Sequence, residues 1–250
     1  MTAAAIAASG LGKDFGPVRA LDHLDLEVRE GEFFGFLGPN GAGKTTTVHL
    51  FATLLAPSRG GARVAGHDIV RESLRVRRSI GLVFQETTLD RDLTVVENLR
   101  FAARLWDLPR RLAEPRIGQL LRQFGLGERR HDPVRALSGG LRRAVDIARG
   151  ILHEPRVLFL DEPTAGLDPR ARRSLWELIR GLREASGVTV FLTTHYVEEA
   201  EPCDRVAVLD QGRLVALGTP ADLKREAGVR SLEEVFLART GHRLADTNGG

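Results

Sequence analysis

Cysteine, lysine and tyrosine are nearly absent from this chain of 250 residues. It contains one cysteine, Cys203, and one tyrosine, and among its 36 basic residues only Lys13, Lys44 and Lys224 are lysines. A single cysteine excludes an intrachain disulfide, and with it a disulfide-stapled scaffold, and it fits a reducing compartment. Because arginine supplies almost all of the positive charge, each lysine marks a position to examine.

Long apolar runs and a strong net charge are also lacking. No uncharged apolar run reaches the roughly 18–20 residues that span a bilayer, and the Ala-rich start Met1–Gly12 has no basic segment before its apolar part. The sequence therefore predicts a soluble cytoplasmic protein without a secretory signal. Its 36 Lys+Arg against 33 Asp+Glu leave a charge of +3, a weak field that predicts no nucleic-acid partner.

The composition that remains is that of a globular protein, with 42% hydrophobic residues arranged in short runs. Leu24–Val28 alternates apolar and acidic residues, which is typical of a half-buried strand. Other runs are apolar throughout, as in parallel strands that helices cover on both faces. These runs are Phe33–Leu37, Ile80–Phe84, Val157–Leu160 and Val188–Leu192. A hairpin is predicted where Val206–Leu209 and Leu214–Leu217 flank a Gly-containing turn.

The stretch from Glu86 to Arg135 is arginine-rich and helical in pattern. Thr94 and Glu97 have capping-box spacing, and apolar residues then recur on one face, which we interpret as core packing. The sequence predicts one α/β domain over residues 5–240. Its mixed sheet core has an antiparallel portion, and a helical subdomain at about residues 86–150 is inserted into it. Residues 241–250 are expected to form a flexible tail.

The strongest motif is Gly38-Pro39-Asn40-Gly41-Ala42-Gly43-Lys44-Thr45, which fits G-x-x-x-x-G-K-[ST] between an apolar strand and a helical pattern. The glycines let backbone N–H groups turn toward phosphate oxygens, and a helix from about Lys44 to Leu55 adds its positive N-terminal end. Lys44 offers a charge to the β- and γ-phosphates, and Thr45 offers a hydroxyl to Mg²⁺. The motif predicts a P-loop NTPase fold, with Thr46 also among the nucleotide-binding residues.

A carboxylate at the end of another buried strand completes such a site. Asp161 follows Val157–Leu160 and is a candidate ligand of Mg²⁺. Glu162 comes next, where a general base would polarise the water that attacks the γ-phosphate. A strand-end carboxylate can instead cap the next helix, but the phosphate loop favours the catalytic interpretation.

A third motif narrows the class of NTPase. Leu137-Ser138-Gly139-Gly140 precedes an amphipathic run, and a hydroxyl with two bare amides at a helix N-terminus forms a second anion site. At this point the sequence resembles the ATPases of ATP-binding-cassette (ABC) transporters, over about Leu11 to Gly241. The resemblance implies that two subunits, identical or different, dock head to tail. Ser138, Gly139 and Gly140 of each subunit would then cover the ATP on the phosphate loop of the other.

The resemblance implies a role for four further residues. Phe15 matches the aromatic residue that stacks on adenine, and an ordinary core phenylalanine is the alternative. Gln85 matches a glutamine that touches Mg²⁺ or the attacking water. Asp168 matches a residue that crosses the dimer, and His195 matches a histidine that contacts the γ-phosphate.

One position departs from the family pattern. Leu141 stands where the family usually has glutamine, which puts in doubt a hydrogen bond across the dimer. Leu141-Arg142-Arg143 resembles a drug-export subset of the family, as do Leu175–Arg180 and Ser231–Leu237. The arginine pairs elsewhere in the chain are interpreted as solvated faces, and contact of those in the helical stretch with a membrane partner or anionic headgroups is the alternative.

The expected function is ATP hydrolysis coupled to solute export through a separate membrane permease, at the cytoplasmic face of the membrane. The catalytic residues are expected to be Lys44, Gln85, Glu162 and His195, with ATP as nucleotide and Mg²⁺ held by Thr45, Gln85 and Asp161. Three alternatives remain in other classes. They are a permease-free ABC ATPase of DNA repair or translation, a regulatory subunit that does not hydrolyse ATP, and a GTPase. The last lacks an Asn-Lys-x-Asp segment to read guanine.

Overall fold

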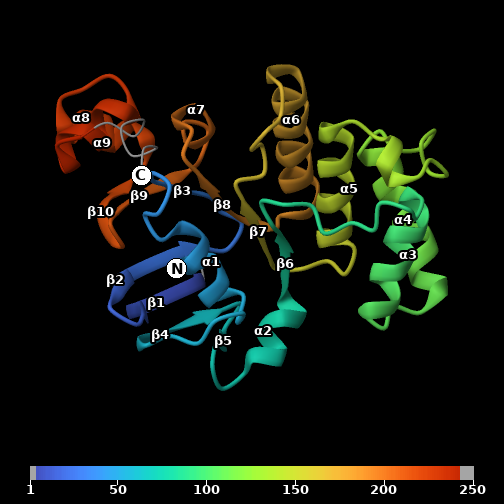
Figure 1. Ribbon diagram of the computed structural model, residues 1–250, viewed down its shortest axis with the longest axis horizontal. Helices are drawn as coiled ribbons and strands as arrows, with labels where there is room; N and C mark the ends of the chain where they lie inside the picture. Colours follow the sequence, from blue (N-terminus) through green and yellow to red (C-terminus); the bar gives the residue numbers. More distant parts are fainter. Residues whose placement is uncertain (1–3, 243–250) are drawn as a thin grey trace.

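The computed structural model describes residues 4–242, and a six-stranded sheet runs through its centre (Figure 1). The strand order is β10-β9-β3-β8-β7-β6, and every neighbouring pair is parallel except β10 with β9. All residues of β3, β7 and β8 are buried, as their continuous apolar runs predict. The strands are β3 (Phe33–Leu37), β6 (Ile80–Val83), β7 (Val157–Asp161), β8 (Thr189–Thr194), β9 (Arg205–Asp210) and β10 (Arg213–Gly218).

A second sheet of four antiparallel strands, in the order β2-β1-β4-β5, is drawn in blue and cyan in Figure 1. Its strands are β1 (Ala4–Phe15), β2 (Val18–Arg29), β4 (Arg59–Val64) and β5 (His67–Asp68). Of these strands, the sequence pattern predicts only Leu24–Val28, in the C-terminal half of β2. The long strand β1 escapes prediction because its alanines and glycines have low strand propensity.

The two faces of the central sheet are covered differently. In β7, Leu158 and Leu160 pack with helices α3 to α6, whereas Val157 and Phe159 pack with α1 and the antiparallel sheet. Helices therefore lie on both faces, as predicted, but on the second face α1 shares the cover with the antiparallel sheet. The helices are α1 (Lys44–Phe51), α2 (Ser73–Ser79), α3 (Val95–Leu105), α4 (Arg110–Gln123), α5 (Gly139–Ile151), α6 (Pro169–Ser186), α7 (Val197–Ala200), α8 (Pro220–Ala227) and α9 (Leu232–Thr240), with a 3₁₀ turn at Val134–Ala136.

A cluster of aromatic rings fixes α1 against the central strands. Phe191 of β8 lies 5.5 Å from Phe34 of β3, 5.7 Å from Phe51 of α1 and 5.5 Å from Phe159 of β7, measured between ring centroids. Each of these side chains is fully buried, which stabilises the fold by about 1.5–3 kcal/mol per ring. The helix that follows the phosphate loop is thereby fixed relative to the strands that carry Asp161 and His195.

Cys203 lies directly beneath β3. It is 5% exposed, and a Cβ placed on Gly35 would lie only 3.0 Å from its sulfur. Burial raises the pKa of the Cys203 thiol. The lone cysteine is therefore an inert packing residue.

The helical stretch predicted from Glu86 onward contains α3 and α4 and continues into α5 (Figure 1). Thr94 and Glu97 form the predicted capping box, with Thr94 N donating to Glu97 Oε2 at 2.8 Å. Arg100 of α3 then donates two hydrogen bonds to Glu114 of α4, at 2.7 and 2.9 Å. None of the helices within residues 4–242 has the length and hydrophobicity of a membrane span.

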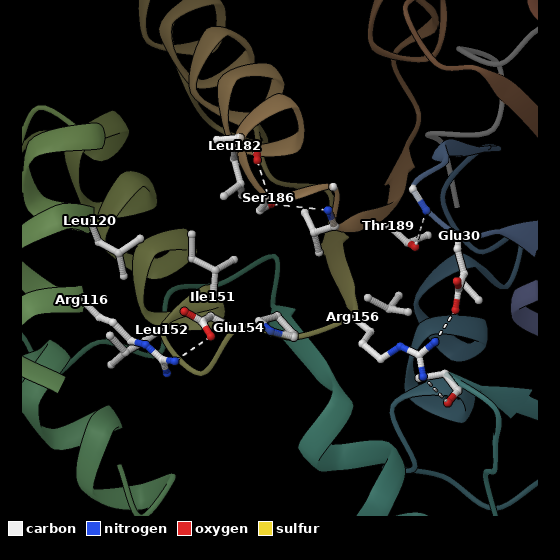
Figure 2. Close-up of a pocket in the computed structure, with 18 of the residues that line it drawn as sticks. Glu30, Arg116, Leu120, Ile151, Leu152, Glu154, Arg156, Leu182, Ser186 and Thr189 are labelled. Carbon is white, nitrogen blue, oxygen red and sulfur yellow. Dashed lines mark hydrogen bonds and ion pairs between the residues drawn. The ribbon is translucent and has the colours of Figure 1, made fainter. Parts of the chain in front are cut away.

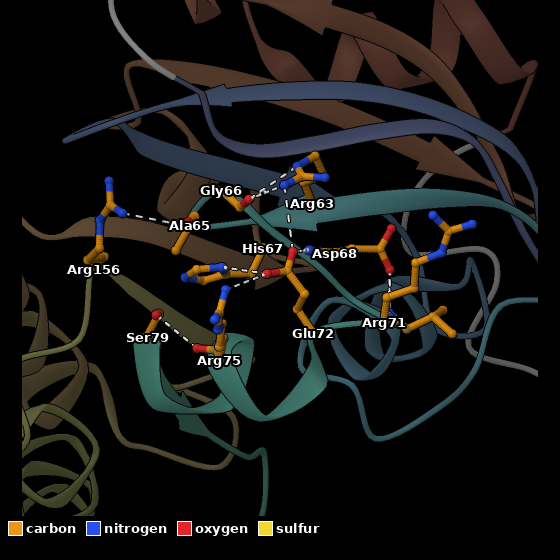
Figure 3. Close-up of polar contacts among 11 residues, drawn as sticks. Arg63, Ala65, Gly66, His67, Asp68, Arg71, Glu72, Arg75, Ser79 and Arg156 are labelled. Carbon is orange, nitrogen blue, oxygen red and sulfur yellow. Dashed lines mark hydrogen bonds and ion pairs between the residues drawn. The ribbon is translucent and has the colours of Figure 1, made fainter.

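The helix α2 is tied to the antiparallel sheet through Glu72 (Figure 3). The Glu72 carboxylate accepts a hydrogen bond from Asp68 N at 3.1 Å and pairs with Arg75 at 3.0 Å and His67 at 3.5 Å. Because β6 follows α2 without a loop, this contact network sets where β6 begins and where the segment that carries Gln85 leaves the sheet.

Candidate functional site

The phosphate loop, residues 38–44, joins β3 to α1 at the carboxyl edge of the parallel strands. Gly43 has φ of +104°, and a Cβ there would lie 2.4 Å from Ala20 O. A Cβ on Gly38 would lie 2.4 Å from Leu209 O. Both obstacles are backbone atoms, so these positions require glycine, as the motif predicts. The helix α1 ends at Phe51 rather than near Leu55.

Lys44 occupies the centre of the loop and is 4% exposed. Its Nζ donates to Gly38 O at 2.7 Å and to Pro39 O at 2.9 Å, and lies 3.0 Å from Glu162 Oε1. Burial lowers the pKa of Lys44, and the neighbouring Glu162 and Asp161 oppose that shift. The loop therefore holds a cation that is surrounded by its own carbonyl groups and faces one carboxylate.

Glu162 brings two of the candidate residues together. Its carboxylate lies 3.0 Å from Lys44 Nζ and 3.0 Å from His195 Nδ1. The backbone of Glu162 has φ of +45°, which is uncommon for any residue but glycine, and its N–H donates to Thr193 O at 3.1 Å. Burial by itself would raise the pKa of Glu162, but His195 and Lys44 together outweigh it and lower the pKa.

His195 follows β8, which includes the two threonines before it. Because the ionised Glu162 carboxylate only accepts hydrogen bonds, His195 Nδ1 donates to it. When the ring is neutral, Nε2 is then its acceptor. The edge of the sheet thus carries Lys44, Glu162 and His195 in one connected group.

The three candidate metal ligands lie at different depths. Asp161 is 2% exposed at the end of β7 and accepts a hydrogen bond from Thr193 Oγ1. Thr45, in the first turn of α1, and Gln85, in the segment after β6, are both exposed. Among the described residues, no hydrogen bond joins these three side chains to one another.

Phe15 ends β1, and its side chain is exposed. It is 47% accessible, and Lys13 Nζ lies 5.2 Å from the ring centroid. The alternative interpretation, an ordinary core phenylalanine, is therefore wrong.

The third motif lies on a different surface from the phosphate loop. Ser138 caps α5 by accepting a hydrogen bond from Leu141 N at 3.3 Å, and Asp168 caps α6 by accepting from Arg170 N and Ala171 N. Ser138, Gly140, Leu141 and Asp168 line one groove of about 910 Å³, and no phosphate-loop residue lines it. The structure therefore divides the predicted residues into two groups.

A cavity of about 580 Å³ lies at the opposite edge of the central sheet, near the amino ends of β7 and β8 (Figure 2). Two ion pairs border it, Arg116 with Glu154 at 2.6 Å and Arg156 with Glu30. None of the predicted site residues lines this cavity.

Comparison with known proteins decides the family. The family model described as ABC transporter matches residues 21–165. The chain belongs to the ABC transporter family. It is the ATP-binding and ATP-hydrolysing subunit of such a transporter, and the predicted ABC ATPase fold is confirmed.

Curated ABC relatives match most of the chain. The daunorubicin resistance ATP-binding protein DrrA3 of Streptomyces coeruleorubidus is 48% identical over 237 residues, which cover 94% of this chain and 75% of that protein. The Nod factor export ATP-binding protein I of Ralstonia nicotianae is 44% identical over 219 residues, which cover 87% of this chain and 68% of that protein.

Solved ABC structures agree with the fold. An ATP-binding subunit of an ABC transporter superposes with a TM-score of 0.83 at 32% identity, covering 94% of this chain and 99% of its own. The cbiO1 protein of Clostridium perfringens, part of the ABC transporter complex cbiONQ, gives 0.82 at 30% identity, covering 89% and 91%.

One residue that connects parts of the candidate site is not predicted from the sequence. Glu199 of α7 is 2% exposed, and its carboxylate accepts hydrogen bonds from Thr164 Oγ1 and, at 2.6 Å, from Thr194 Oγ1. It thereby ties the segment after Glu162 to the end of the strand before His195. The sequence shows Glu199 only as one of several neighbouring acidic residues, which look like a solvated face, and nothing in that pattern marks it as buried.

Proposed function

We propose that this ABC subunit hydrolyses ATP in a head-to-tail pair, with a second copy or a related subunit, and so powers export of a drug-like or lipophilic solute through a separate permease. The observation that carries the hydrolytic site is the group formed by Lys44, Glu162 and His195 beside the phosphate loop. The solute class rests on relatives whose names refer to daunorubicin resistance and Nod factor export. No role for nucleic acid is proposed.

In the proposed mechanism, water attacks the γ-phosphate in line with its leaving group. Backbone N–H groups of the loop (Gly38, Pro39, Asn40, Gly41, Ala42, Gly43), with the start of α1 at Lys44, Thr45 and Thr46, would bind the phosphates. Lys44 would stabilise the charge that develops on them. Glu162, whose pKa is lowered by His195 and Lys44, would accept a proton from the water, and His195 would hold that carboxylate in place.

The donor set near the loop fits Mg²⁺. Asp161 supplies a buried carboxylate at the sheet edge, and Thr45 and Gln85 supply a hydroxyl and an amide oxygen, all of them ligands that Mg²⁺ prefers. When bound there, Mg²⁺ would neutralise phosphate charge. Thr193 would orient Asp161 through the hydrogen bond that it donates.

The second group of residues supports the paired arrangement. Ser138, Gly139 and Gly140 begin one helix and Asp168 begins another, around a groove separate from the phosphate loop. In a head-to-tail pair these helix ends would meet the nucleotide of the other subunit, while the exposed Phe15 would stack on the adenine of its own. Leu141 lines the same groove and offers an apolar contact there.

We further propose that residues 5–240 form one domain with a helical subdomain at about 86–150, held at the cytoplasmic face of the membrane by the permease. The segment 86–150 includes α3, α4 and most of α5, whose apolar faces share one core with the central sheet. Most of the predicted tail, from residue 243 onward, lies outside the described residues.

The test of this function is Glu162→Gln, which keeps the shape of the side chain and removes its charge. Turnover of ATP is expected to fall by about 10²–10⁴, the usual contribution of a general base, while ATP still binds. Glu184→Gln on α6 is the matched control, because Glu184 is exposed, and it should hydrolyse ATP at the original rate. Near-normal turnover in Glu162→Gln would remove Glu162 from this role.

A further inference from the structure

One face of α5 carries charged side chains at a spacing of three residues: Arg143, Asp146 and Arg149. Arg143 is 6% exposed and Asp146 is 2% exposed. Charged groups are seldom buried this deeply unless they are paired. The partners of these three residues therefore show what the charged face of α5 holds in place. All three face the segment that leaves β6 and carries Gln85, residues 84–88, which we call the Gln85 loop.

Two arginines of α5 hold the Gln85 loop at both ends. Arg143 donates to Phe84 O at 2.5 Å and to Gln85 O. Six residues later on the same helix, Arg149 donates to Thr88 O at 2.9 Å and to Thr88 Oγ1. Because three of these four bonds are to backbone carbonyls, they fix the path of the loop largely independently of its side chains.

Asp146 lies between the two arginines and balances their charge. It is 3.0 Å from Arg149, and burial raises the pKa of its carboxyl, opposed by contacts with Thr87 and the two arginines. An anion buried beside two cations keeps the arginine side chains extended toward the loop. The helix face and the loop therefore form one connected unit.

The same helix begins at Ser138, the start of the second anion site. Arg143 comes five residues after Ser138, about 7.5 Å further along a rigid helix. Gln85 and Ser138 are thus attached to opposite parts of one stiff element, although they belong to the two separate groups of site residues described above.

We propose that Arg143 and Arg149 are positioning residues that couple two nucleotide sites, an inference that rests on the proposed head-to-tail pair. In that pair, Ser138 faces the nucleotide of the partner subunit and Gln85 serves the nucleotide of its own. A shift of α5 when Ser138 engages one ATP pulls the Gln85 loop at the other. Binding at one site therefore changes the other through α5.

The test compares Arg143→Met with Arg100→Met in the full chain. Arg100→Met is the control because it removes another paired arginine of the helical segment without touching the loop. The dependence of hydrolysis on ATP concentration is expected to be cooperative in the original chain. Arg143→Met should bring the Hill coefficient close to 1 and lower the coupling between sites by about 5- to 100-fold, while Arg100→Met keeps it.

Two further measurements keep the inference falsifiable if Arg143→Met folds poorly. Thr88→Val removes only the exposed hydroxyl that Arg149 contacts, and it should lower the Hill coefficient partway. Amide hydrogen exchange should quicken in residues 84–88 in both loop variants and not in Arg100→Met. An unchanged Hill coefficient in the variants with a loosened loop, or an equal loss in Arg100→Met, overturns the coupling role. Failure of the hydrolytic mechanism would show separately, in Glu162→Gln.

Discussion

Two glycines and one lysine decide the geometry of the phosphate loop at the scale of single residues. Gly38 and Gly43 each face a carbonyl oxygen of another segment, and Lys44 fills the space that the curled backbone encloses. The motif specifies all three because each has a physical task that no other residue type performs. The contacts beyond the motif, such as that between Glu162 and His195, join residues 33 positions apart and come only with the fold.

Gly43→Ala is expected to destabilise the loop more than Gly41→Ala. Both glycines have positive φ, but a Cβ on Gly43 meets Ala20 O at 2.4 Å, whereas a Cβ on Gly41 has nothing within 4 Å. The φ strain alone is of the order of 1 kcal/mol, and the clash adds to it at Gly43 only. Urea unfolding of the two variants measures the difference, and equal losses of unfolding free energy would contradict the role of the close approach.

At the scale of helices and strands, short polar contacts align neighbouring elements. The strand β8, helix α7 and the segment between β7 and α6 meet at the buried carboxylate of Glu199. The Arg172 guanidinium, 4.3 Å from the Tyr196 ring centroid, comes from α6 to the same place. These contacts set the relative positions of Glu162, Asp168 and His195, which lie on the segments being joined.

Glu199→Gln is expected to gain stability relative to the original chain as pH rises. Burial raises the pKa of Glu199 above its ordinary value of 4.5, although the two threonine hydroxyls oppose the shift. From about pH 4.5 upward the unfolded chain loses this proton before the folded chain does, so the contribution of Glu199 to stability declines as pH rises. Glutamine does not titrate. Unfolding free energies of both chains at pH 4.5 and pH 7 measure the effect, and a pH-independent difference between them would refute it.

The sequence predicts a strand or helix correctly where the local residues alone determine it. The central strands and the Thr94 capping box follow from apolar runs and cap chemistry, and both are confirmed. The antiparallel strand β1 is not predicted, because it gains its stability from pairing with β2 and β4 rather than from its own residues. Arg143 and Asp146 also look like the polar face of an amphipathic helix until their partners in the Gln85 loop are known.

The whole molecule has its candidate residues on two separate surfaces. The phosphate loop group lies at the edge of the central sheet, and the Ser138 group lines the groove between α5 and α6. In the proposed pair, one chain would therefore offer half of each of two nucleotide sites. The net charge of +3 describes neither surface, because the positive potential that would bind phosphate there is local and comes from the N-terminal ends of helices.

At the scale of the whole molecule, binding to the proposed permease can be tested directly. A tagged chain extracted from membranes in mild detergent is expected to carry a protein with several membrane spans, and its ATP turnover should rise in that complex. A parallel preparation without the tag is the control for adventitious capture. Recovery with ribosomes or DNA, and never with a membrane protein, would refute the transport role and support the permease-free alternative.

The position of Cys203 has a practical consequence. It is the only thiol in the sequence, it lies under β3, and its raised pKa keeps it protonated at neutral pH. Maleimide reagents attack exposed thiolates, so the native chain should resist them while folded. A cysteine introduced on the surface would then be the single labelled position, and fluorescent dyes or spin probes can follow movements of α5 without first removing the native residue.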